Sequence, residues 1–136
     1  MNLKEMKKKI VFFSVLLFLM LSAPFAQQKK DWKEMKSFHS IMSKTFHPTE
    51  DGNMQPLKDS VDILVATAKT WQSAQVPEGY NAKVTKPILK KLVKQCNTIK
   101  KAVMTKKSDD ELKKLIAAAH DIFHEIMEKC TKEEHQ

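Results

Sequence analysis

Two histidines and two sulfur-containing residues stand close together near the end of the chain. The stretch HDIFHEIMEKC at 120–130 places His120 and His124 four residues apart, followed by Met127 and Cys130. On a helix, residues four apart lie on the same side one turn apart, so two imidazoles at this spacing can hold one metal ion. Histidines are also common on the flank of an ordinary amphipathic helix, so the pair alone does not decide between the two interpretations.

A second group of candidate ligands lies earlier in the chain, where His39 and His47 flank Met42. If this segment is a helix, a rotation of about 100° per residue places His39 about 40° from Met35, on the face expected to be apolar. A buried imidazole needs a partner. We therefore expect His39 to face the pair on the last helix and to complete an imidazole-rich site.

The elements that must position these side chains are four amphipathic helices, predicted over 31–46, 53–73, 85–105 and 108–129. Their apolar residues recur at steps of three and four, and no run has a period of two. Pro48 is expected to end the first helix, and Asn53 and Ser108 to cap the second and fourth. Short loops then predict an all-α, antiparallel up-down-up-down four-helix bundle, in which the first and last helices are neighbours.

The predicted function is the binding of a transition metal ion between the first and last helices. Imidazole and sulfur ligands suit Cu, Zn or Ni. Such a protein would buffer, chaperone or sense the metal, and its partner would be a metal-export or redox protein. The primary candidate ligands are His39, His47, His120 and His124, and the additional candidates are Glu50, Met42, Met127 and Cys130.

The N-terminal segment 1–26 is predicted to be a secretory signal peptide. A basic start is followed by the apolar run IVFFSVLLFLMLSAPF and by small residues that end at Ala26. An uncleaved membrane anchor is the alternative, because sixteen mostly apolar residues come close to spanning length. Cleavage would leave one domain over 27–136, periplasmic or secreted and not an integral membrane protein.

Charge and cysteine content narrow the classes of function further. The net charge is +8 and every basic residue is lysine, whereas nucleic-acid readers use arginine forks, so nucleic acid is not an expected partner. The lysines predict a solvated surface with a weak attraction for anions. If the last two helices form a hairpin, Cys96 and Cys130 lie about 18 Å apart, so no disulfide is expected between them.

In size, export signal and architecture, the chain resembles the cytochrome c-prime and soluble b-type cytochrome superfamily. The resemblance implies a haem held near the start of the first helix and the end of the last, with Met35 and His124 (or His120) in comparable places. The sequence has no CxxCH, which excludes covalent haem c and leaves non-covalent haem b. The chain is also similar to exported bundles of Bacteroidetes type with an FHP turn and a terminal HDxFHxIxxKC stretch, a likeness that implies no activity.

Two further interpretations stay open beside metal binding. One is a haem-b electron carrier that uses Met35 and His124, and the other is a structural or interaction bundle without a cofactor. An enzyme is not expected, since the sequence contains neither a nucleophile elbow nor a glycine-rich phosphate loop.

Overall fold

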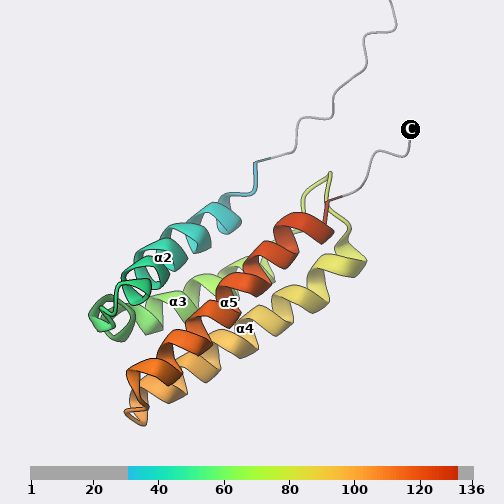
Figure 1. Ribbon diagram of the computed structural model, residues 1–136. Coiled ribbons are helices and arrows are strands. Elements are labelled where there is room, and N and C mark those ends of the chain that lie inside the picture. The colour runs from blue at the N-terminus through green and yellow to red at the C-terminus, as the bar shows by residue number, and fades with distance from the viewer. Residues whose placement is uncertain (1–30, 132–136) are drawn as a thin grey trace, which may run out of the picture.

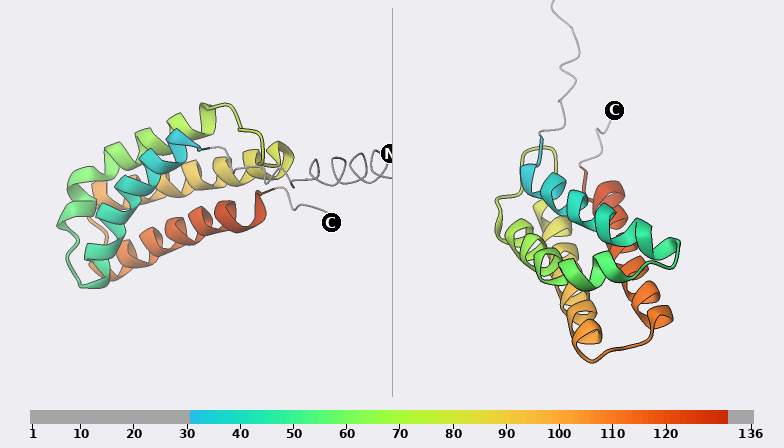
Figure 2. Two further views of the ribbon diagram at one scale, coloured as in Figure 1. Left: turned by 90° about the horizontal axis from the view of Figure 1, so that it is seen from above. Right: turned by 90° about the vertical axis from the view of Figure 1, so that its left-hand side faces the viewer.

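Four helices pack side by side in the computed structural model, which describes residues 31–131. They are α2 (Lys33–Glu50), α3 (Gln55–Ser73), α4 (Ala82–Met104) and α5 (Asp109–Lys129). Each helix packs against the next along the chain, and α2 also packs against α5, which closes the bundle (Figures 1 and 2). The prediction of an all-α, antiparallel four-helix bundle is confirmed.

Polar side chains accept hydrogen bonds from backbone N–H groups where three of the helices begin. Asn81 accepts a hydrogen bond from Lys83 N at 3.1 Å, and Ser108 accepts one from Glu111 N at 3.2 Å. Asn53 accepts one from Gln55 N, also at 3.1 Å. These bonds satisfy backbone donors that a helix start leaves unpaired. The cap at Ser108 agrees with the prediction, whereas the N-cap of α3 is Met54 and Asn53 lies one residue before it. The helix α4 begins three residues before the predicted 85 because Asn81 was not recognised as its cap.

The first helix extends past the proline that was expected to end it. Pro48 lies inside α2, which continues to Glu50 and ends where Gly52 takes a φ of +83°. A proline removes one backbone donor and is tolerated most easily in the first turn of a helix, so Pro48 in the last turn of α2 departs from that preference. Pro48 O in turn accepts hydrogen bonds from Asp51 N and Asn53 N. The prediction that α2 stops before His47 is therefore wrong, and His47 is a helical residue.

The core is continuous and unusually aromatic at the end where α2 starts. Phe38 and Trp71 are fully buried with ring centroids 5.5 Å apart, and Phe123 packs 5.9 Å from Trp71. Trp32 lies edge-on to both Trp71 and Tyr80. Burying rings of this size is the main source of stability in such a bundle. This cluster fixes the start of α2 against the loop that leads into α4.

Both cysteines are buried free thiols, and they lie far apart along the bundle. Cys130 sits at the end of α5 against Thr85, and Asn81 N donates to its carbonyl oxygen at 2.8 Å. Thr85 and Cys96 are eleven residues apart on α4, about 16 Å at the rise of a helix. This agrees with the separation that argued against a disulfide. Burial raises the pKa of Cys96 to about 12, so this thiol is neutral.

The predicted signal peptide over 1–26 and its cleavage near Ala26 lie outside the described residues. Among the helices that the structure does describe, none combines the length and the apolar character needed to cross a membrane.

Candidate metal centre

The closest pair of candidate ligands is His120 and His124, on the side of α5 that borders α2. Their Nε2 atoms are 3.2 Å apart, and the ring centroids are 4.5 Å apart. One turn of helix brings the two rings together, as the spacing predicts. In the metal-free protein one ring can donate a hydrogen bond to the other, provided that only one of the two nitrogens carries a proton.

His120 is half-buried, and a phenyl ring from the neighbouring helix holds it in place. The Phe46 ring stacks on it with centroids 4.0 Å apart and planes 14° from parallel. Burial lowers the pKa of His120, and His124 and His47 lower it further, although Asp121 and Glu50 act in the opposite direction. Burial disfavours the charged imidazolium. His120 is therefore a neutral imidazole at neutral pH, the form that binds metals.

His47 approaches the same place from the last turn of α2. Its ring centroid lies 6.4 Å from that of His120, and its Nδ1 lies 3.0 Å from Glu50 Oε2. If Nδ1 donates to this carboxylate, Nε2 of His47 is left with a free lone pair. A carboxylate that orients the far nitrogen of an imidazole is common behind metal-bound histidines. The exposed Glu50 therefore orients His47, and its charge also acts on His120.

The three rings are close together, but they do not yet form a closed ligand set. Two imidazoles on one tetrahedral ion would have centroids about 5 Å apart, whereas His47 and His120 are at 6.4 Å. Within residues 31–131, no group of three or more His, Cys, Asp or Glu side chains is arranged so as to hold a metal ion. A third protein ligand would thus need the His47 ring to move by about 1.4 Å, the difference from that tetrahedral spacing. Its side chain is exposed enough for such a movement.

His39 does not lie where the helical pattern placed it. The residue is exposed rather than on the core face, and its ring stacks on Phe123 with centroids 4.9 Å apart and planes 8° from parallel. Its Nε2 lies 3.4 Å from Ser43 Oγ. Phe123 also touches His124 edge-on at 5.7 Å, so one phenyl ring separates the two imidazoles. The expectation of a buried His39 facing the pair is wrong, and its role as a ligand stays a prediction.

The remaining sulfur candidates lie in or beside the core. Met42 is fully buried and Cys130 is buried at the end of α5, whereas Met127 is half-buried against the core. Cys130 is six residues beyond His124, about 9 Å along the helix. Met35 accepts a hydrogen bond from Tyr80 Oη, with oxygen and sulfur 3.8 Å apart. These placements explain the sulfurs as packing groups, the ordinary role of methionine in a core.

Phe46 is the residue of this site that the sequence analysis missed. Its position directly before His47 made it look like the last apolar residue of the helix. It lies about 80° from Phe38 around α2, and so points toward α5 rather than toward the centre of the core. A helical-wheel projection with Phe38 at the centre of the core face would have shown that Phe46 lies on the flank toward α5.

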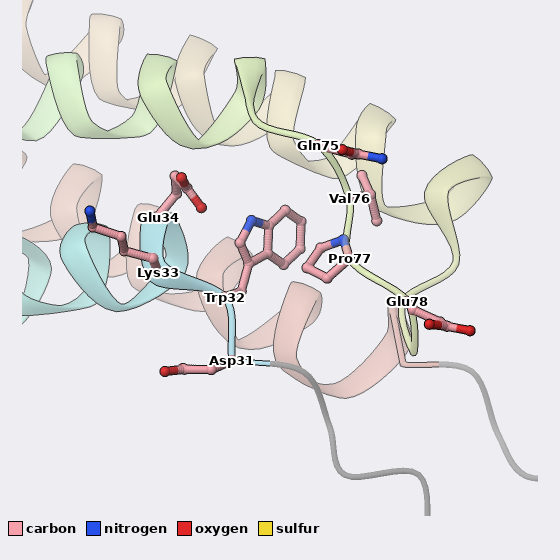
Figure 3. Close-up of a pocket in the computed structure, with 8 residues that line it drawn as sticks. All are labelled: Asp31, Trp32, Lys33, Glu34, Gln75, Val76, Pro77 and Glu78. Carbon is pink, nitrogen blue, oxygen red and sulfur yellow. The ribbon is translucent and has the colours of Figure 1, made fainter.

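A separate pocket of about 430 Å³ lies at the start of α2 (Figure 3). Trp32 lines it together with three carboxylates, and no candidate metal ligand does. The lining residues are Asp31, Trp32, Lys33, Glu34, Gln75, Val76, Pro77 and Glu78. The buried Nε1 of Trp32 has no hydrogen-bond partner among the described residues. This pocket belongs to the aromatic end of the bundle and not to the histidine pair.

The fold and the site define an all-α four-helix bundle with a histidine pair on one flank. Comparison of the chain with protein-family models, curated proteins and solved structures gave no match. The resemblance to cytochromes, and the haem site over Met35 and His124 that it implies, therefore stay predictions.

Proposed function

We propose that the bundle binds a transition metal ion through the Nε2 atoms of His120 and His124. The proposal rests on the 3.2 Å separation of those atoms. Two nitrogens bound at 2.0–2.1 Å to one tetrahedral ion are about 3.3 Å apart. In the metal-free protein the two Nε2 atoms are therefore already about as far apart as two nitrogens bound to one ion, and little rearrangement of α5 would be needed on binding.

The surroundings of the pair also favour a cation. The lowered pKa of His120 means that protons compete weakly for this nitrogen at neutral pH. The Phe46 ring limits the rotation of His120 and so reduces the entropy lost on binding. Asp121 and Glu50 are the nearby carboxylates that act on His120, and their negative charge favours a positive charge at the pair.

His47 is the third ligand in this proposal, and Glu50 is its orienting group. Imidazole-rich sites suit Zn, Cu and Ni, which differ in the geometry they prefer. Three histidines would leave a position open to water or to a ligand from another protein. An open position permits exchange of the ion, which is what a metal buffer or a metal chaperone requires. If the signal peptide is cleaved as predicted, this exchange takes place in the periplasm or outside the cell.

Calorimetric titration of the metal-free protein with Zn²⁺, Cu²⁺ and Ni²⁺ tests the proposal. We expect one ion per chain in the wild type and a loss of affinity of at least tenfold in either His120→Ala or His124→Ala. His39→Ala is the matched control, because His39 lies at the same helix interface but stacks on Phe123. Unchanged binding in both single variants of the pair would refute the site.

The His47 arm of the proposal has its own test. His47→Ala removes the third ligand and should weaken metal binding. Glu50→Gln leaves that ligand in place and removes only its orienting carboxylate, a group that typically contributes 10- to 100-fold in affinity. Its loss of affinity should therefore be smaller than that of His47→Ala. Equal affinity in His47→Ala and the wild type would reduce the site to the two histidines of α5.

A further inference from the structure

The positive charge of this protein is concentrated in one helix. Residues 79–108 contain nine lysines and neither aspartate nor glutamate. Since the whole chain has a net charge of +8, the other 106 residues together carry −1. The excess charge is thus a property of α4 and its flanking turns, and not of the surface in general.

The lysines of α4 form a straight stripe on its outer side. Five of them fall within an arc of about 80° at the helical rotation of 100° per residue, opposite the buried residues Leu92 and Cys96. All five are exposed and none forms an ion pair with another described residue. The stripe consists of Lys83, Lys86, Lys90, Lys94 and Lys101.

Two other lysines of the helix lie beside the stripe and are neutralised by neighbouring helices. Lys91 pairs with Glu125 on α5 at 3.0 Å, and Lys100 pairs with Asp62 on α3 at 2.7 Å. The carboxylates of α3 and α5 therefore form ion pairs with lysines on the two flanks of α4, and the positive charge on its outer side is not neutralised by such pairs. From the first lysine to the last, the stripe is about 27 Å long at a rise of 1.5 Å per residue. The helix α4 lies along one side of the bundle (Figure 1), and all five lysines of the stripe are exposed to solvent.

Exposed apolar side chains stand near both ends of the stripe. Val84 is 37% exposed beside Lys83, and Met104 is 70% exposed three residues after Lys101. Only Ile63, on α3, joins them as an exposed large hydrophobic residue among the described residues. A soluble linear polyanion would gain nothing from these two side chains, whereas the boundary between lipid head groups and acyl chains would receive them.

We propose that α4 is a docking surface for a membrane that contains anionic lipids. A lysine ammonium is a compact, hydrated point charge that needs no fixed geometry at the phosphate. A straight row of such charges matches a flat, mobile layer of anionic head groups, which attracts basic residues without sequence-specific contacts. Adsorbed in this way, the bundle would keep the interface of α2 and α5, and with it the histidine pair, off the lipid surface.

Binding to vesicles tests this proposal, with EDTA present so that metal binding does not contribute. The protein is produced with its full sequence in an exporting host, and its mass is measured so that the form assayed is known. Vesicles contain equal parts of phosphatidylglycerol and phosphatidylcholine, and vesicles of phosphatidylcholine alone serve as the reference. Each lysine near an anionic surface strengthens adsorption about fivefold. Replacing four lysines of the stripe should thus weaken binding roughly several hundred-fold at low salt.

The matched comparison removes the same charge from a different place. The stripe variant carries Lys83→Gln, Lys86→Gln, Lys90→Gln and Lys94→Gln, and the control carries Lys33→Gln, Lys44→Gln, Lys69→Gln and Lys114→Gln. We expect the control to keep most of its binding, and Met104→Gln to lose part of it even at salt concentrations that screen the lysines. Equal losses in the two quadruple variants would overturn the proposal, because net charge alone would then explain adsorption. Binding to polyphosphate or DNA without binding to vesicles would overturn it as well.

Discussion

Truncation of His124 should remove the metal-dependent stability of this bundle and leave the metal-free protein almost unchanged. The side chain is exposed, and its described contacts are with His120 and the edge of Phe123. Surface substitutions of this kind usually change the free energy of unfolding by no more than about 0.5 kcal/mol. His124→Ala therefore separates loss of the site from loss of the fold.

The magnitude follows from mass action. An ion that binds only the folded state stabilises it by about 2.7 kcal/mol when the free concentration is one hundred times the Kd. For a domain of about 100 residues, each kcal/mol moves the Tm by roughly 4–8 °C. The wild type should then melt about 10–20 °C higher with saturating metal than with EDTA. In His124→Ala a single imidazole remains on α5, and most of this rise should disappear.

Thermal unfolding followed by far-ultraviolet circular dichroism measures the effect directly, because the fold is all helix. Each protein is melted with EDTA and with a series of Ni²⁺ or Zn²⁺ concentrations, so that the rise can be compared with the calorimetric Kd. His39→Ala should keep the full rise. A wild-type Tm that does not respond to saturating metal, or an equal rise in His124→Ala, would refute the reasoning.

Three further predictions concern the metal-free protein. The pKa of His120 is lowered from 6.5 in the folded state, so the unfolded chain binds more protons in mildly acid solution; stability should fall as the pH drops below about 6.5, and His120→Gln should reduce this slope in urea titrations. Phe38→Ala should cost about 3–5 kcal/mol by urea denaturation, because the ring is fully buried against Trp71 and Phe123; a cost below about 1 kcal/mol would contradict its central place. Ser108→Ala should cost about 1 kcal/mol and Ser108→Asp much less, because only alanine removes the cap of α5.

The part of the fold that could be read from the sequence is the part that local chemistry determines. Ser108 gave the start of α5 because a cap acts within three residues of itself. The four helices followed from apolar periodicity, and the antiparallel order followed from short loops. The end of α2 was misjudged because the rule for residues before proline describes a preference of the backbone. In this protein the capping bonds to Pro48 O outweigh that preference.

The rotation of α2 about its own axis was harder to predict, and two buried threonines are the reason. Thr45 and Thr49 are fully buried, although threonine is usually counted as polar. Their hydroxyls donate to helix carbonyl oxygens, Thr45 to Ile41 O at 2.9 Å and Thr49 to Phe46 O at 2.7 Å. A hydroxyl that is satisfied within its own helix can be buried at little cost. The true core face therefore runs through Phe38, Met42, Thr45 and Thr49, and not through Met35.

This rotation decides which histidine can meet the pair on α5. Measured from the centre of the true core face, His39 lies about 90° around α2 and Phe46 lies about 70° around it in the same direction. Phe46, about one turn beyond Met42, stacks on His120, and the adjoining His47 lies close to the same ring. A chelating pair at i and i+4 is fixed by one helix and can be found in a sequence. A third ligand depends on the angle and register between two helices. An error of about 50° in the rotation of α2 was enough to place His39 near the core face, and the proximity of His47 to His120 depends on how α2 packs against α5.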